Sequence, residues 1–192
     1  MTPEGAGRSH VCLLRGINVG GRNRVPMENF RASLEALGCH DVLTYIQSGN
    51  AVFRWEGSLP AGFAASVHEK IRDATGTSCE VVTVGARQFF TAANGNPYIE
   101  EPSPTKVHLV FFANALTEQS KALIQAAAER ARSKGSPDRA EVIGEVLYLH
   151  TPDGLGRSLL AAELAKLPRS AQGTARNWAT VTHLRGLLDP TL

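Results

Sequence analysis

The chain has 192 residues, of which 43% are hydrophobic and 20% charged, and its formal net charge is +2. This composition is typical of a folded globular protein and excludes disorder beyond the ends. The length fits one large domain or two small ones. No apolar run approaches the ~20 residues that span a bilayer, and residues 1–9 lack the apolar core of a secretory signal. We therefore expect a cytoplasmic protein with no membrane partner.

The cysteine and histidine patterns predict neither disulfides nor a metal site. Cys12, Cys39 and Cys79 are odd in number, far apart and free of any Cys-x-x-Cys pair, so reduced and partly buried thiols are expected. The six histidines show no metal-ligand spacing. We expect no metal and no cofactor.

Positive charge gathers toward the two ends of the chain. Residues 5–34 carry five arginines and a single acid, and residues 164–188 carry four basic residues and no acid. If the two segments meet in space they form a positive face; the alternative is a set of arginines scattered over a solvated surface.

The first predicted elements are a strand and an amphipathic helix. Residues 10–15 form a short apolar run that ends at Gly16, as a buried strand does. Pro26 suits the first turn of a helix, and apolar residues recur at i, i+3, i+7 and i+10 from Met27 until Gly38 stops the pattern.

A hairpin, a second helix and a strand follow. Residues 42–47 and 51–55 are rich in β-branched and aromatic residues and flank the turn-forming residues 48–50. Helical spacing continues over residues 62–75, and a further strand is expected at 80–84.

The second half repeats this order imperfectly. Its expected elements are a short helix at 86–93, a connector at 94–105, a strand at 107–113, a helix at 117–133, a hairpin of 140–143 with 146–150, a helix at 158–167 and a last helix at 177–188 opened by residues 174–178.

This order predicts an α+β fold of two ferredoxin-like (βαββαβ) halves, with a mostly antiparallel sheet and helices on one face. The expected organisation is a flexible N-terminus at 1–8, a first half at 9–93, a connector at 94–105, and a second half at 106–192 that ends in C-terminal helices. Because the last segment favours helix over a closing strand, the second half is expected to be an incomplete copy.

Residues 15–24 form a candidate anion cradle. This loop leaves a buried strand and ends at a helix start, where free N–H groups and the helix dipole favour negative charge. Its glycines allow close approach to the backbone, and arginines can grip a phosphate or carboxylate bidentately. The loop matches neither a dinucleotide fingerprint nor a P-loop, and a glycine-rich turn with solvated arginines is the alternative.

Three further polar segments are candidate sites. Side-chain amides at residues 47–50 can orient a ligand, although turn chemistry alone explains most of this segment. Residues 153–158 join a strand to a helix. Arg176 and Asn177 open the last helix without an evident packing role, although either Thr174 or Asn177 can cap that helix.

The sequences LLRGINVGG at 13–21, TYIQSGN at 44–50 and TARNW at 174–178 together resemble the bacterial family numbered 1697 among domains of unknown function. The likeness extends from about residue 10 to 188 and includes NPY at 96–98 and GLGRS at 154–158. It implies a duplicated ferredoxin-like architecture with no established activity. Ala179 and Leu159 depart from the family pattern, which argues against a chemical role for those two positions.

We expect the chain to bind a small anionic ligand, phosphorylated or nucleotide-like. The residues expected to line the site, provided that their three segments meet, are Arg15, Asn18, Arg22, Gln47, Ser48, Asn50, Arg176 and Asn177. Nucleic-acid binding is a weaker alternative, because ferredoxin-like sheets occur in RNA-recognition domains and both chain ends are basic. A regulatory or protein-interaction module is the third. The sequence shows no paired carboxylates and no nucleophile–base pair, so it does not indicate whether the protein is a catalyst. Oligomeric state is open as well.

Overall fold

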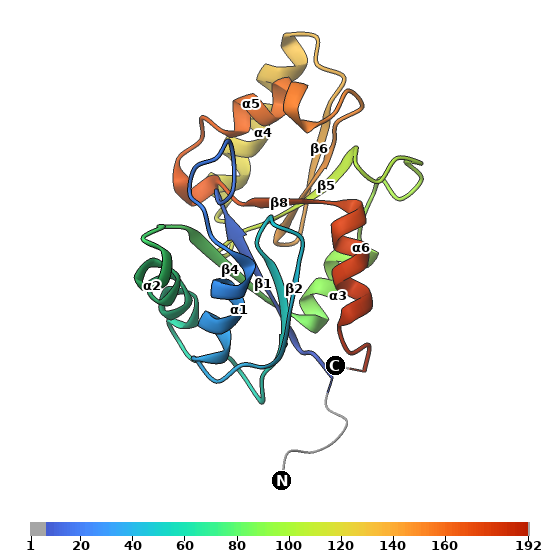
Figure 1. Ribbon diagram of the computed structural model, residues 1–192. Coiled ribbons are helices and arrows are strands. Elements are labelled where there is room, and N and C mark those ends of the chain that lie inside the picture. Colours follow the sequence, from blue (N-terminus) through green and yellow to red (C-terminus); the bar gives the residue numbers. More distant parts are fainter. Residues whose placement is uncertain (1–6, 192) are drawn as a thin grey trace. The chain divides into compact units, whose positions relative to one another are not determined.

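The computed structural model describes residues 7–191, and residues 1–6 of the expected flexible N-terminus lie outside this range (Figure 1). The described residues form a mixed α/β fold with two four-stranded antiparallel sheets and six α-helices. The chain divides into two compact units, one of Met1–Thr91 with His183–Leu192 and one of Ala92–Thr182.

The first unit contains one sheet of strand order β2-β3-β1-β4. Its elements are β1 (His10–Arg15), α1 (Met27–Glu35), β2 (His40–Tyr45), β3 (Asn50–Arg54), α2 (Phe63–Thr75), β4 (Glu80–Gly85) and most of α3 (Ala86–Asn94). Cys12 and Leu14 of β1 pack with the buried side chains of α1 and α2, while Val11 and Leu13 point to the opposite face and are also fully buried. Burial on both faces explains why β1 reads as a continuous apolar run instead of an alternating one.

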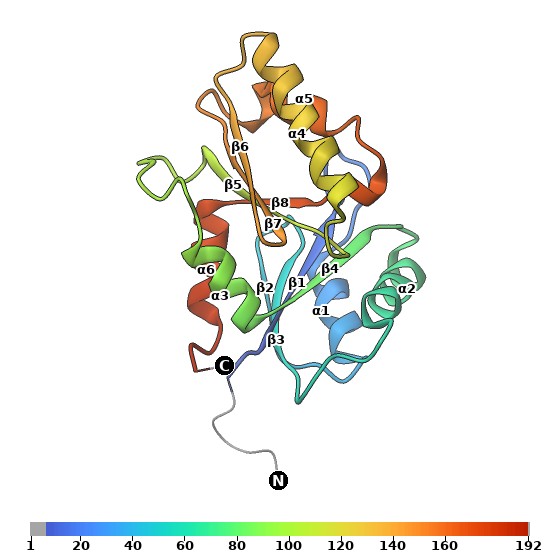
Figure 2. The same cartoon turned by 180° about the vertical axis from the view of Figure 1, so that it is seen from behind.

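The second unit contains the other sheet, of strand order β6-β7-β5-β8. Its elements are β5 (Val107–Phe111), α4 (Glu118–Ser133), β6 (Arg139–Ile143), β7 (Val146–His150), a 3-10 turn (Leu155–Arg157), α5 (Leu159–Leu164), a second 3-10 turn (Arg169–Ala171), β8 (Thr174–Asn177) and the start of α6 (Trp178–Leu187). Thr117 caps α4, because its side chain accepts a hydrogen bond from the Ser120 N–H. Seen from behind, α4 runs along the second sheet with α5 beside it (Figure 2).

The structure corrects the expectation for residues 174–178. Residues 174–177 form strand β8, which pairs with β5 and closes the second sheet, and the helix begins only at Trp178. The buried residues of β8 are Thr174 and Arg176, whereas the partly buried Ala175 packs against the core under α4. A strand whose buried positions are polar gives no apolar periodicity, so the pattern favoured the following helix instead.

Candidate functional site

The loop between β1 and α1 is built on a tight turn at its tip. Val19 and Arg22 form an isolated antiparallel bridge, and the Arg22 N–H donates to the Val19 carbonyl at 3.0 Å. Gly20 and Gly21 between them have φ values of +57° and +74°. Positive φ at both central positions is the pattern of a type I′ turn, which glycine adopts without steric cost. The turn holds Arg22 out in solvent.

Asn18 fastens this loop to the hairpin of β2 and β3. Its side-chain nitrogen donates to the carbonyl oxygens of Val25, at 3.0 Å, and of Gln47, at 2.7 Å. Its side-chain oxygen accepts from the Val25 N–H at 3.0 Å. The backbone of Asn18 is left-handed, with φ +53°, a conformation that asparagine tolerates better than most residues. Asn18 therefore sets the distance between two loops from different parts of the sequence.

The hairpin loop that receives this bond is strained. Ile46 has φ +47° although it is β-branched, and its side chain is 50% exposed. A left-handed β-branched residue costs on the order of 1–2 kcal/mol and is rare outside sites where surrounding contacts impose it. Ile46 directly follows the end of β2 and precedes Gln47 in the hairpin loop.

Residues 48–50 hold the loop together from inside. The Asn50 side-chain amide is fully buried and donates to the Tyr45 carbonyl at 3.1 Å and to Ser48 Oγ at 2.9 Å. The Gly49 carbonyl accepts from the Leu14 N–H at 2.8 Å, which ties the loop to β1. Of these three residues Ser48 alone is exposed.

A pocket of about 390 Å³ opens where the two loops meet the amino end of α1. It is lined by Asn18, Arg24, Val25, Pro26, Met27, Glu28 and Gln47. Asn18 and Gln47 were both expected from the sequence, and the structure brings them to one pocket. The other lining residues had not been singled out, although Arg24 was recognised as part of the loop.

The pocket combines an uncapped helix start with one exposed guanidinium and one carboxylate. Pro26 precedes α1 and offers no capping side chain, so the N–H groups of the first turn have no partner within the helix. Thr77 Oγ1 donates to the Arg24 carbonyl at 3.2 Å and anchors that residue's main chain, while the guanidinium stays exposed. Glu28 is the one acid in the lining, and it offsets part of this positive potential.

Arg15 lies on β1 and is not among the lining residues of this pocket. Its Nη1 is 2.8 Å from Glu80 Oε2, and the register of β1 and β4 sets these two residues directly opposite one another. Each side chain is 29% exposed. Arg15 is thus held in a half-buried cross-strand ion pair.

The remaining two expected site residues belong to the second unit and have local partners there. Arg176 is 7% exposed, and its Nη1 donates to Thr174 Oγ1 at 2.7 Å and to the Ala175 carbonyl at 2.9 Å. Asn177 Oδ1 accepts from the Thr180 N–H at 2.9 Å, so Asn177 caps α6. The segment 153–158 likewise ends in a cap, because Ser158 Oγ accepts from the Ala161 N–H at 2.8 Å.

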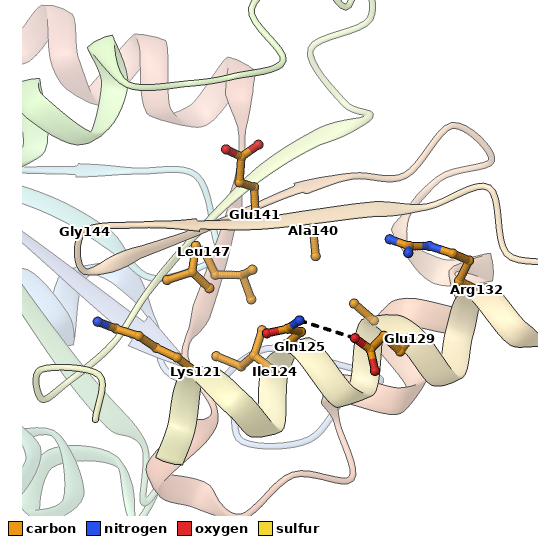
Figure 3. Close-up of a pocket in the computed structure, with 11 residues that line it drawn as sticks. Lys121, Ile124, Gln125, Glu129, Arg132, Ala140, Glu141, Gly144 and Leu147 are labelled. Carbon is orange, nitrogen blue, oxygen red and sulfur yellow. Dashed lines mark hydrogen bonds between the residues drawn. The ribbon is translucent and has the colours of Figure 1, made fainter. Parts of the chain in front are cut away.

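A larger groove of about 510 Å³ lies between α4 and β6 within the second unit (Figure 3). Ile124 and Ala128 of α4 and Ala140, Val142 and Leu147 of the sheet supply its apolar lining. The charged residues Lys121, Glu129 and Arg132 of α4 also line it. Glu141 of β6 borders the groove too, but its carboxylate points away from α4 (Figure 3). Sequence reasoning did not find this groove, because it depends on how α4 lies over an edge strand.

Two histidines of the second unit have unusual surroundings. His150 Nε2 is 2.7 Å from Glu101 Oε2, Tyr98 stacks on the imidazole, and the hydrogen bond from His150 lowers the pKa of Glu101. His108 is 7% exposed with no hydrogen-bond partner for Nδ1 among the described residues, and its burial lowers its pKa to about 4. Glu101, Tyr98 and His150 form a compact carboxylate–imidazole–phenol cluster.

Comparison with known proteins adds an identity to this geometry. The model of the family "Protein of unknown function (DUF1697)" matches residues 8–148. The chain belongs to this family. No curated protein matches the chain.

The DUF1697 fold also has a counterpart among solved structures. The chain is 21% identical to the conserved bacterial protein SP0830 from Streptococcus pneumoniae, with a TM-score of 0.66 over 95% of this chain and 99% of that one. At this identity the likeness shows the fold alone. Among residues 7–191 of this DUF1697 protein, no helix combines the length and the apolar character that crossing a membrane requires.

Proposed function

We propose that this protein binds a small anionic ligand, phosphorylated or nucleotide-like, in the pocket at the amino end of α1. The observation that carries the proposal is the meeting of the two loops at an uncapped helix start, in a pocket whose lining includes Asn18, Gln47 and Arg24. Backbone N–H groups at such a position bind phosphate and carboxylate groups without any further cofactor. Arg22 is exposed on the turn between the lining residues Asn18 and Arg24, and we expect it to add positive charge to the site.

Backbone strain supports a binding role for this corner of the first unit. Ile46 has a left-handed conformation directly before Gln47. The side-chain nitrogen and oxygen of Asn18 both form hydrogen bonds with the backbone of the two loops. Strained residues persist where the surrounding structure imposes them, and they concentrate at ligand sites. The proposed role of Asn18 is therefore to position Gln47 and the α1 entrance, while Arg22, Arg24 and Gln47 contact the ligand.

We also propose that the two units are copies of one ferredoxin-like unit. Two strand orders support this: β2-β3-β1-β4 in the first sheet corresponds position by position to β6-β7-β5-β8 in the second. In each sheet the third strand in chain order pairs with the first and second, and the fourth pairs with the first. A cytosolic location is proposed as well, because Cys12, Cys39 and Cys79 are free and buried.

Nucleic-acid binding through an open sheet face is the less favoured alternative. RNA-recognition domains stack bases on exposed aromatic residues of their sheet. In the first sheet β3 is buried along its whole length, and Phe53 is fully buried. A pocket at a helix start suits a small anion better than it suits a polymer.

Thermal-shift measurements with inorganic phosphate, a nucleoside monophosphate and a sugar phosphate test the proposal. A ligand that binds only the native protein raises the melting temperature. We expect at least one of these anions to do so for the wild type, and the shift to shrink in Arg24→Gln.

Arg31→Gln is the matched control, because it removes the same charge from an exposed position of α1. Arg31 does not line the pocket. If the ligand-induced rise in melting temperature shrinks equally in both variants, the effect comes from net charge and not from the pocket. If none of the three anions raises the melting temperature of the wild type, the proposal is contradicted. A gel-shift series at rising salt addresses the alternative, since nucleic-acid binding weakens steeply as salt increases.

A further inference from the structure

Strand β6 leaves one edge of the second sheet open. The strand order places β6 at the end of the sheet, with β7 as its partner on the other side. Ile143 and Val146 pair across the two-residue turn of the β6–β7 hairpin, and the pair that closes such a turn exchanges both backbone hydrogen bonds. Alternate residues therefore aim their N–H and C=O groups outward: these are Ala140 and Val142.

The same two residues direct their side chains toward α4. Ala140 and Val142 are half-buried and pack with the core under α4, whereas Arg139, Glu141 and Ile143 are exposed. Figure 3 shows Glu141 pointing away from α4, on the other side of the strand from the groove. An added strand could therefore form hydrogen bonds with the backbone of two residues of β6. The apolar groove lies on one face of β6, and the charged side chains lie on the other.

The charges on that face carry opposite signs two residues apart. Arg139 and Glu141 are both exposed, and neither forms an ion pair with any residue of 7–191. Natural edge strands use charges to repel unwanted strands, which requires that the charges do not match those of the incoming strand. When a second β6 strand runs antiparallel to the first, its alternating positive and negative residues can lie opposite residues of the other sign.

Antiparallel pairing of two β6 strands about a two-fold axis at Ala140 satisfies this match. Ala140 of one copy then lies opposite Ala140 of the other. The two-fold axis creates two Arg139–Glu141 pairs, because the Arg139 of each copy faces the Glu141 of the other. The exposed Ile143 lies opposite Pro137, which is also exposed. Centring the axis on Glu141 instead would set two carboxylates against each other, which is unfavourable.

We propose that β6 is a self-pairing edge, through which a second copy of this chain docks and joins the two β6-containing sheets into one of eight strands. Edge-to-edge pairing of this kind supplies affinity through main-chain hydrogen bonds and specificity through the facing side chains. This interface is independent of the anion pocket, which lies in the first unit.

Sedimentation equilibrium of paired charge-reversal variants tests the interface. We expect a dimer for the wild type. Arg139→Glu and Glu141→Arg each turn both attractive contacts into repulsive ones and should weaken self-association by about tenfold or more. An equimolar mixture of the two variants restores every opposite-charge contact, so it should form a heterodimer, and the double swap Arg139→Glu/Glu141→Arg should dimerise alone.

Folding and net charge are controlled separately. Both positions are exposed, so circular dichroism should give unchanged spectra, and Arg87→Glu makes the same charge reversal at an exposed position of the first unit and should leave the dimer intact. A wild-type chain that stays monomeric overturns the proposal. So does a dimer that tolerates both single reversals, or a mixture of folded variants that fails to associate.

Discussion

The side-chain amide of Asn18 donates a hydrogen bond of 2.7 Å to the main-chain carbonyl of Gln47, across 29 positions of sequence. The same amide spans the β1–α1 loop through two bonds with Val25. One side chain thereby holds both loops that border the pocket at the start of α1.

Replacing Asn18 by Asp should destabilise the protein and loosen this corner. Asp keeps the oxygen that accepts from Val25 but loses the two donated bonds and places a carboxylate against two carbonyl oxygens. We expect a loss of roughly 1–3 kcal/mol in the free energy of unfolding, measured by urea denaturation. Asn114→Asp, at an exposed position, makes the same exchange and should cost much less. Equal costs would show that Asn18 does not link the loops.

Gly49 should tolerate alanine far less well than Gly57 does. Both have left-handed backbones, with φ +78° and +77°. A Cβ on Gly49 would lie 2.7 Å from Leu14 Cβ and 2.8 Å from Ile17 Cδ1, whereas nothing lies within 4 Å at Gly57. Gly57→Ala reports the backbone strain of about 1–2 kcal/mol, and Gly49→Ala should exceed it by roughly 1–3 kcal/mol of overpacking. Comparable unfolding free energies for the two variants would refute this close approach.

Acid should destabilise the protein through His108. Burial lowers its pKa to about 4, while the unfolded chain titrates near the ordinary value of 6.5. As pH falls below 6.5 the unfolded state gains a proton that the folded state does not accept, so stability is lost progressively down to about pH 4. The full loss is on the order of 3 kcal/mol.

The contribution of His108 is isolated by variants at two pH values. Between pH 7 and pH 5 the unfolding free energy of the wild type should fall more than that of His108→Gln. His40→Gln alters an exposed histidine and should keep the wild-type slope. A slope that His108→Gln leaves unchanged would mean that this imidazole is accessible to protons in the folded state.

Glu163 should matter more for stability than its partners do individually. Its carboxylate accepts from Arg130 at 3.0 Å, Lys134 at 2.6 Å and Lys166 at 2.7 Å, and these bonds lower its pKa to about 2. Glu163→Gln leaves three cations without their shared partner and should lower the melting temperature more than Lys134→Gln or Lys166→Gln. Its benefit is present above pH 4.5 and disappears as pH falls toward 2. A smaller effect for Glu163→Gln than for either lysine would be inconsistent with this arrangement.

Sequence reasoning found the elements that bury apolar side chains in a regular period. The helix after Pro26 and the two hairpins were predicted because their apolar residues repeat at helical spacing or flank turn residues. Strand β8 was missed because its buried positions are Thr174 and Arg176. Its place in the sheet depends on pairing with β5, which no local pattern records.

The candidate site was predictable in part. Asn18 and Gln47 were expected and share the pocket, but Met27 and Glu28 were assigned only to a helix, and their exposure to the pocket follows from tertiary packing. The side chain of Asn50 is drawn inward by Tyr45 and Ser48, a consequence of the hairpin geometry that residue type alone does not reveal.

NMR titration with inorganic phosphate and with a nucleoside monophosphate, followed through the backbone amide shifts, examines the start of α1 residue by residue. We expect saturable shifts at the amides of Met27, Glu28 and Asn29 and at the side chain of Gln47, and smaller shifts in Arg24→Gln. Saturable shifts confined to other parts of the chain, or no saturable shift with either ligand, would contradict an anion site at the start of α1.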